Sequence, residues 1–333
     1  MSERFQILSL DGGGLKGIFT ASFLSAIEET TRKNIVDYFD LIAGTSTGGI
    51  IALALGLGFR PEEILSFYKE RGNDIFPAQS FCGRVPLNIK TWFRRKYSSK
   101  PLQCALRDYF GNRRLCESTK RLIIPSYDSV RGAVYIYKTP HHEKLRTDYK
   151  ELVQDVALAT TSAPTYFQSF ITDAGVRLID GGIWANNPSM VALAEALGYL
   201  ARPQGTIAIL SIGTTRQTLT SMKSHIAGGI WAWRRKALEF MMSGQSRAAE
   251  NQCFHILSDD RFLRINPTVG GDYALDKMSE ELEGIGKTEA RNRVDEVNNI
   301  FLQHKAKPYL PIYKLDGSSS DRVQLEENSN NDK

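Results

Sequence analysis

The stretch that decides the fold is Tyr38-Phe39-Asp40-Leu41-Ile42-Ala43-Gly44-Thr45-Ser46-Thr47-Gly48, which runs into the apolar residues Ile50 to Leu57. Two apolar segments joined by a glycine-bounded turn predict a strand, a sharp turn and a helix. Glycine suits positions 44 and 48 because the turn is strained and the helix packs close to the strand. Such a turn presents one serine hydroxyl at the top of a sheet. Ser46 is therefore a candidate nucleophile, although a turn that merely caps a helix fits the same residues.

Length and composition are those of an ordinary globular protein. The 333 residues are 42% hydrophobic and 24% charged, with a net charge of +5, which suits one large α/β domain or two smaller ones. The longest apolar run, Ile50 to Phe59, is about half as long as a bilayer span requires. The N-terminus has no basic start, apolar stretch or cleavage site of a signal peptide. The sequence therefore predicts a cytoplasmic protein.

Cysteine and histidine show no pattern of a disulfide framework or a metal site. We expect reduced thiols, because neither metal spacing nor a disulfide rhythm relates Cys82, Cys104, Cys116 and Cys253. The adjacent pair His141-His142 lies in a polar stretch without a Cys, Asp or Glu cluster at ligand spacing. We therefore expect a solvated loop there and no bound metal.

Two stretches interleave aromatic and cationic residues: Lys90 to Lys100 and Ile230 to Lys236. Aromatic rings favour the headgroup layer and cations favour phosphates, so both are candidates to contact a membrane surface or a nucleotide. For either stretch taken alone, a solvated basic face beside packed aromatic rings is the favoured interpretation. No block of like charge suggests a nucleic-acid tail, so we expect no DNA or RNA partner. The candidate contact residues are Trp92, Arg94, Arg95, Lys96, Trp231, Trp233, Arg234 and Arg235.

Strand-like and helix-like segments alternate along the chain, which predicts a mostly parallel sheet covered by helices. The expected strands are 5–10, 38–43, 121–126, 133–138, 177–179, 206–212 and 262–265. The expected helices are 17–31, 50–57, 61–71, 152–161, 190–200 and 280–304, the last as one helix or two. We expect one domain over 1–315, with an insert at about 76–102 and a largely helical part at about 224–310. Residues 316–333 are rich in Ser, Asn, Asp and Glu, which predicts a disordered tail.

A second motif, Asp11-Gly12-Gly13-Gly14-Leu15-Lys16-Gly17, lies between the first expected strand and the first expected helix. Its glycine spacing matches a dinucleotide-binding turn. Consecutive glycines at a helix N-terminus also expose backbone N–H groups to one point, which suits either a pyrophosphate or the oxyanion of an acyl-transfer intermediate. The next strand ends in Gly44-Thr45-Ser46 rather than in an acidic residue, which favours the oxyanion.

A third motif, Asp180-Gly181-Gly182, follows the expected strand at 177–179. A carboxylate on a tight glycine turn can take a proton from a serine within hydrogen-bond reach. A turn aspartate that bonds its own backbone is the structural alternative. No histidine follows a strand end as the third member of a triad usually does, because helical stretches contain His225, His255 and His304.

Four motifs resemble the patatin-like phospholipase family in order and spacing: the glycine loop at 11–17, Gly-Thr-Ser-Thr-Gly at 44–48, Ala-Thr-Thr-Ser-Ala-Pro-Thr-Tyr-Phe at 159–167 and Asp-Gly-Gly-Ile-Trp-Ala-Asn-Asn-Pro at 180–188. The resemblance implies a three-layer α/β/α fold with a nucleophile-elbow serine and a lipid acyl hydrolase of phospholipase A type, without metal or cofactor. It implies Ser46 as nucleophile and Asp180 as base, a dyad without histidine. The oxyanion loop it implies is Gly12, Gly13, Gly14 and Leu15, and the supporting glycines are Gly44, Gly48, Gly181 and Gly182.

The chain is also similar to bacterial patatin-like effectors of anti-phage signalling systems, through the start Phe-Gln-Ile-Leu-Ser-Leu-Asp-Gly-Gly-Gly at 5–14, the compact size and the basic-aromatic stretches. This resemblance implies a cyclic di- or oligonucleotide activator and a phospholipid membrane substrate, reached from the inner face of the cell membrane. An ungated acyl hydrolase of lipid turnover, a dinucleotide-binding oxidoreductase and a non-catalytic lipid-binding module remain alternatives. The sequence is compatible with an oligomer.

Overall fold

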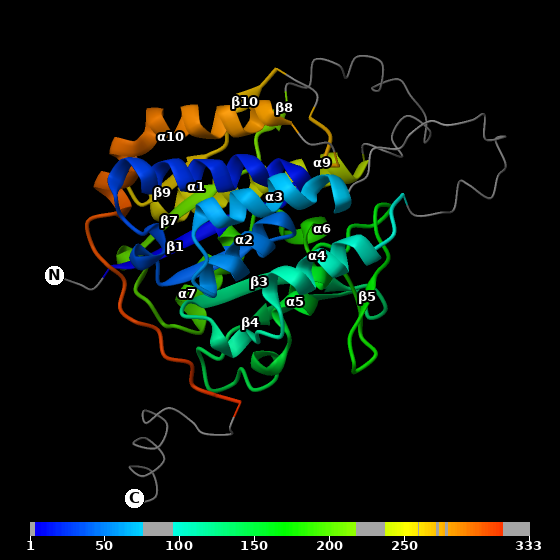
Figure 1. Ribbon diagram of the computed structural model, residues 1–333. Helices are drawn as coiled ribbons and strands as arrows, with labels where there is room; N and C mark the ends of the chain where they lie inside the picture. Colours follow the sequence, from blue (N-terminus) through cyan, green and yellow to red (C-terminus); the bar gives the residue numbers. More distant parts are fainter. Residues whose placement is uncertain are drawn as a thin grey trace, which may run out of the picture.

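Helices and strands in layers make up the computed structural model, which describes residues 4–75, 96–217, 237–258, 260–270, 273–276 and 279–315 (Figure 1). The strands are β1 Phe5–Leu10, β2 Leu41–Gly44, β3 Arg121–Asp128, β4 Ala133–Lys138, β5 Phe170–Ile171, β6 Arg177–Asp180, β7 Ile207–Ile212, β8 Arg216–Gln217, β9 Phe262–Ile265 and β10 Thr268–Val269. The α-helices are α1 Gly17–Thr31, α2 Thr47–Gly56, α3 Pro61–Ile75, α4 Lys100–Phe110, α5 Val153–Thr160, α6 Gly182–Ala185, α7 Ser189–Gly198, α9 Ala237–Leu257 and α10 Glu280–Phe301.

An eight-stranded sheet forms the middle layer, in the order β5-β6-β3-β2-β1-β7-β9, with β4 paired to β3. The neighbours from β3 to β9 along this order are parallel. Strands β4 and β6 run antiparallel to β3, and β5 runs antiparallel to β6. The prediction of a mostly parallel sheet is therefore confirmed, with an antiparallel edge added to it. Leu10 pairs with both Gly44 and Ile212, so the ends of β1, β2 and β7 meet at one edge of the sheet.

Both faces of the sheet are covered, which confirms the predicted three layers. Along β1, Phe5 and Ile7 face one core together with Leu193 of α7, whereas Leu8 and Leu10 face the other. Helices α1 to α5 and α10 contribute to that second core, and α10, α1 and α3 run side by side along it in Figure 1. Because the strand is buried on both faces, its sequence is apolar almost throughout rather than alternating.

Most predicted elements are confirmed, and three helices differ from the prediction. Helix α4 was not predicted, and its first turn overlaps the expected insert at 76–102, of which 76–95 lie outside the described residues. Its apolar face buries Leu102, Leu106 and Phe110, but the basic residues around its start hid that periodicity. Helix α3 continues to Ile75. The expected helices at 280–304 are the single helix α10, which packs along α1. Residues 218–236 and 316–333 also lie outside the described part.

The expectation of a solvated loop at His141-His142 is wrong for His141. Its side chain is fully buried, with Nε2 3.0 Å from Glu195 Oε1 on α7 and Nδ1 2.9 Å from Thr139 Oγ1. Lys138 Nζ donates to the same glutamate at 2.6 Å. Both ring nitrogens therefore contact groups of the protein, and burial lowers the pKa of His141. The cause is tertiary, because α7 brings the carboxylate to the edge strand β4.

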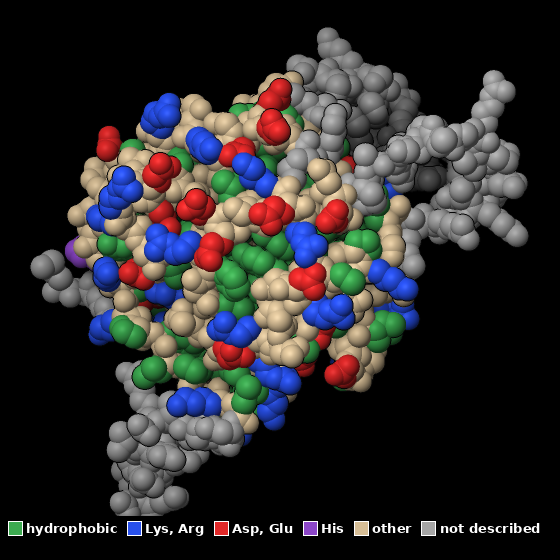
Figure 2. Space-filling view, viewed as in Figure 1, with side chains coloured by type: hydrophobic (Ala, Val, Ile, Leu, Met, Phe, Trp, Pro, Cys, Tyr) green, Lys and Arg blue, Asp and Glu red, His purple; other side chains and the backbone are tan. Residues whose placement is uncertain are grey.

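We searched the described residues for a metal-binding cluster and for a helix that could span a membrane. Among the residues described, no three His, Cys, Asp or Glu side chains gather at metal-binding distance, and Cys104, Cys116 and Cys253 are free. None of the helices in the described ranges is both long and apolar enough to cross a bilayer. On the face in Figure 2, positive and negative side chains are interspersed rather than segregated.

Candidate active site

Ser46 occupies a sharp turn between β2 and α2, as predicted. Its backbone has φ +54° and ψ −120°, a strained conformation for any residue with a side chain. The flanking glycines are required, because a Cβ at Gly44 would lie 2.1 Å from the Gly48 carbonyl oxygen and one at Gly48 would lie 2.2 Å from the Leu10 carbonyl oxygen. The helix therefore starts directly against the end of β1, and the serine points out of the turn.

Thr160, at the end of α5, supports this turn from the side. The Ser46 N–H donates to Thr160 Oγ1 at 3.0 Å, and the Thr160 hydroxyl donates to the Pro125 carbonyl oxygen at 2.6 Å. The Thr160 hydroxyl therefore connects the Ser46 turn to β3. The motif at 159–167 contains Thr160, but its role is not visible in the sequence, because both of its hydrogen-bond partners are distant in the chain.

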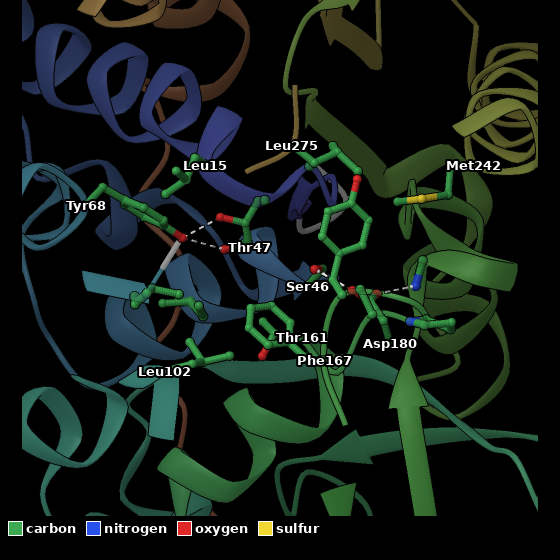
Figure 3. Close-up of a pocket in the computed structure, with 18 of the residues that line it drawn as sticks. Leu15, Ser46, Thr47, Tyr68, Leu102, Thr161, Phe167, Asp180, Met242 and Leu275 are labelled. Carbon is green, nitrogen blue, oxygen red and sulfur yellow. Dashed lines mark hydrogen bonds between the residues drawn. The ribbon is translucent and has the colours of Figure 1, made fainter. Parts of the chain in front are cut away.

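Asp180 meets Ser46 although the two are 134 residues apart in the chain. The Ser46 hydroxyl donates to Asp180 Oδ2 at 2.7 Å, and the Gly182 N–H donates to Oδ1 at 2.7 Å (Figure 3). Burial raises the pKa of Asp180 to about 6, against the opposing effect of these two hydrogen bonds. Gly181 has no room for a side chain, because a Cβ there would lie 2.3 Å from the Pro125 carbonyl oxygen. A carboxylate with this pKa and this contact can accept a proton near neutral pH.

The glycine loop lies beside Ser46, but its four candidate donors are not equivalent. The Gly12 N–H donates to the Asn186 carbonyl oxygen at 3.0 Å, and the Leu15 N–H donates to the Leu275 carbonyl oxygen at 2.8 Å. Within the described part of the chain, the N–H groups of Gly13 and Gly14 donate to no other group. Both glycines line the same pocket as Ser46. Of the four candidate donors, Gly13 and Gly14 are therefore the two whose N–H groups have no acceptor within the described residues.

The pocket around Ser46 is apolar and has about 760 Å³ of space free of atoms, counting its open mouth. Figure 3 shows Tyr68 and Leu102 on one side of Ser46 and Met242 on the other. The Tyr68 hydroxyl is occupied by Thr47, 2.5 Å from Oγ1 and 3.1 Å from the carbonyl oxygen. Apolar side chains from several elements complete the wall: Leu15, Ile50, Phe67, Ile75, Leu102, Phe167, Ile183, Met242 and Leu275. Such a lining suits a hydrocarbon chain rather than a charged ligand.

Of the residues predicted to contact an activator or a membrane, Lys96 is described. Its ammonium group pairs with Asp276 and lies 5.7 Å from the centre of the Tyr166 ring. The Tyr97 hydroxyl donates to the same carboxylate at 2.8 Å. Lys96 is thus held by the protein at the side of the pocket. The other predicted contacts lie outside the described residues: Trp92, Arg94, Arg95, Trp231, Trp233, Arg234 and Arg235.

No histidine is among the described residues that line the pocket. His255 lies in α9 and His304 follows the end of α10, whereas His225 falls outside the described ranges. The candidate site therefore pairs a serine with a carboxylate directly, as the motif arrangement indicated.

Comparison with known proteins matches residues 8–193 to the family model described as patatin-like phospholipase. A protein named cGAMP-activated phospholipase from Pseudomonas aeruginosa is 30% identical over 286 residues, covering 85% of this chain and 84% of the relative. One of the same name from Vibrio cholerae is 33% identical over 303 residues, covering 83% and 82%. The crystal structure of VipD from Legionella pneumophila superposes with a TM-score of 0.48 at 12% identity, covering 89% of this chain and 67% of that one.

Proposed function

This chain belongs to the patatin-like phospholipase family, and from that premise we propose that it is a serine acyl hydrolase of phospholipase A type acting on membrane phospholipids. The observation that carries the proposal is the 2.7 Å hydrogen bond from the Ser46 hydroxyl to Asp180. Ser46 is the nucleophile and Asp180 is the base. The N–H groups of Gly13 and Gly14, which have no other acceptor among the described residues, are the oxyanion donors.

The proposed reaction has two stages. Asp180 accepts the Ser46 proton as Oγ attacks the ester carbonyl carbon, and the resulting oxyanion accepts hydrogen bonds from the glycine loop. Each such donor contributes about 3–4 kcal/mol to transition-state stabilisation in comparable enzymes. The carboxyl proton then passes to the departing lysophospholipid oxygen as the tetrahedral intermediate collapses to an acyl-enzyme. Water activated by the same carboxylate releases the fatty acid and restores Ser46.

The apolar pocket supports a fatty acyl ester as the substrate. One wall is formed by α2, α3 and α4 through Ile50, Phe67, Ile75 and Leu102, which gives an acyl chain a hydrocarbon environment next to Ser46. Each buried methylene gains roughly 0.8 kcal/mol, so chain binding holds the carbonyl near the nucleophile. The substrate headgroup then lies toward the open side of the pocket.

Family membership and the hydrogen bonds of the glycine loop both favour a hydrolase over the other chemical functions that the loop alone allows. A dinucleotide site needs backbone N–H groups for the pyrophosphate, whereas here the Gly12 and Leu15 N–H groups bond to the chain itself. An oxidoreductase also has no use for the contact of Ser46 with Asp180. A lipid-binding module without catalysis would leave that contact unexplained as well.

Activation by a cyclic nucleotide is the narrower part of the proposal. Two relatives with at least 82% of their length covered bear the name cGAMP-activated phospholipase, which supports a cyclic dinucleotide as activator of this chain and a role in antiviral defence. An ungated hydrolase of lipid turnover is the alternative. The two differ in whether hydrolysis depends on the nucleotide.

The test uses the full chain and vesicles of phosphatidylethanolamine and phosphatidylglycerol, with products followed by mass spectrometry. We expect fatty acid and lysophospholipid from the wild type and none from Ser46→Ala, which removes only the hydroxyl. Labelling by a fluorophosphonate should require the same hydroxyl. Lipid hydrolysis by the Ser46→Ala protein would refute the assignment. Parallel reactions with cGAMP, and with a panel of other cyclic nucleotides, test gating, and equal rates throughout would favour the ungated alternative.

A further inference from the structure

Thr214 contacts the glycine loop from outside the matched family region. It lies just after β7, beyond residues 8–193. Its hydroxyl donates to the Gly12 carbonyl oxygen at 3.0 Å. The contact is close, because a Cβ on Gly13 would lie 2.2 Å from Thr214 Oγ1. Thr214 is 6% exposed, so water competes little for this hydrogen bond.

The Gly12 carbonyl and the Gly13 N–H belong to one peptide unit. A trans peptide is planar, and its C=O and N–H bonds point in opposite directions. A hydrogen bond that holds the Gly12 oxygen therefore also determines where the Gly13 N–H points. This restraint matters here because glycine on both sides of the peptide leaves its rotation sterically free. The direction of the proposed oxyanion donor is thus set by Thr214 on the opposite side of the peptide.

Thr214 is itself held on a rigid support. The N–H of the preceding residue, Gly213, donates to the Ile265 carbonyl oxygen at 2.8 Å. The Thr20 hydroxyl donates to the Gly213 carbonyl oxygen at 3.0 Å. The neighbouring Asp11 side chain is clamped in the same region, with Arg264 Nη1 2.8 Å from Asp11 Oδ1. Residues of β9 and α1 thereby position the hydroxyl, as a preorganised site requires.

We propose that Thr214 is a positioning residue for the oxyanion hole, and that it acts by orienting the Gly12–Gly13 peptide. This inference rests on the proposed hydrolase function. It makes the chain beyond residue 193 part of the catalytic arrangement, although Thr214 touches no reacting atom. It also predicts that the hydroxyl, and not the bulk of the side chain, is what catalysis requires.

The chain offers a matched control one residue away. The hydroxyl of Thr215 is also buried but has no hydrogen-bond partner within the described residues, so Thr215→Val removes a hydroxyl without removing a hydrogen bond. The test compares Thr214→Val, Thr214→Ala, Thr214→Ser and Thr215→Val with wild type and Ser46→Ala. It measures kcat and KM on a soluble p-nitrophenyl ester, with and without cGAMP, and the affinity for an alkyl trifluoromethyl ketone. Melting temperatures identify any variant that is misfolded.

Loss of the hydroxyl in Thr214→Val and Thr214→Ala should lower kcat roughly 10- to 100-fold with little change in KM, because a misdirected donor fails mainly in the transition state. Affinity for the ketone, whose adduct carries an oxyanion, should fall by the same factor. Thr214→Ser and Thr215→Val should stay within about threefold of wild type. A folded Thr214→Ala or Thr214→Val protein with wild-type kcat, or equal losses in Thr215→Val, would overturn the positioning role alone. Ester hydrolysis by Ser46→Ala would instead overturn the proposed function.

Discussion

Replacing Asp180 by asparagine should abolish hydrolysis and at the same time stabilise the fold at neutral pH. Burial raises the pKa of Asp180 from its ordinary value of 3.8 to about 6, a difference of about two units. Each unit corresponds to about 1.36 kcal/mol, so the folded protein loses about 3 kcal/mol by holding this carboxylate ionised. An amide keeps the shape and can still accept the Gly182 N–H, but it carries no charge to desolvate and takes no proton from Ser46.

The stability that Asp180→Asn gains over the wild type depends on pH, and its direction follows from the raised pKa of Asp180. Between pH 3.8 and about 6 the folded Asp180 binds more protons than the unfolded residue, so the stability of the wild type falls as pH rises through that window. Below pH 3.8 both states are protonated and the penalty disappears. The asparagine variant should therefore gain up to about 3 kcal/mol over the wild type at pH 8 and little at pH 3.8.

Urea unfolding of both proteins at pH 8 and near pH 4 measures the difference in unfolding free energy, and ester hydrolysis is followed on the same samples. Asp173→Asn is the matched control, because that carboxylate is exposed and its replacement should change neither quantity. An asparagine variant that hydrolyses esters at the wild-type rate would refute the role of Asp180 as base. An equal or lower stability at pH 8 would refute the desolvation argument.

Two further predictions concern the nucleophile and its base. The kcat/KM for a soluble ester should fall about tenfold per pH unit below an apparent pKa of about 6, because the base works only when Asp180 is deprotonated; a profile that stays flat down to pH 4.5 would contradict this. Ser46 has a φ of +54°, which glycine adopts without strain. Ser46→Gly should therefore have an unfolding free energy about 1 kcal/mol higher than that of Ser46→Ala, after the entropy cost of glycine, and so a higher urea midpoint. Both variants should be inactive. Equal midpoints would mean that the turn stores no strain.

Local features of the sequence were sufficient to predict the elements that build the site. The apolar run of β1, the glycines around Ser46 and the glycine turn after β6 each restrict the backbone through sterics or periodicity within a few residues. Their positions and types are accordingly confirmed. The motif order was specific enough to indicate the family, because four short patterns occur at fixed spacing within a span of about half of the chain.

Helix α4 and the state of His141 were missed for different reasons. The apolar face of α4 is present in the sequence but is preceded by basic residues that resemble a loop. The burial of His141 depends on Glu195, 54 residues away, and no local pattern announces such a partner. The antiparallel edge of the sheet was missed as well, because the pairing of β6 with β3 and β5 is a tertiary contact.

What the sequence determined by itself was a set of local shapes: a strained serine turn, a flexible glycine loop and an aspartate on a tight turn. Only the tertiary structure decided how they work together. It brought Asp180 to within 2.7 Å of Ser46 Oγ, and it used Asn186 and Leu275 to occupy two of the four candidate donors. It also placed Thr214 behind the Gly12–Gly13 peptide. These contacts join residues far apart in the chain, so they depend on the packing of the whole sheet and its helices rather than on any short stretch.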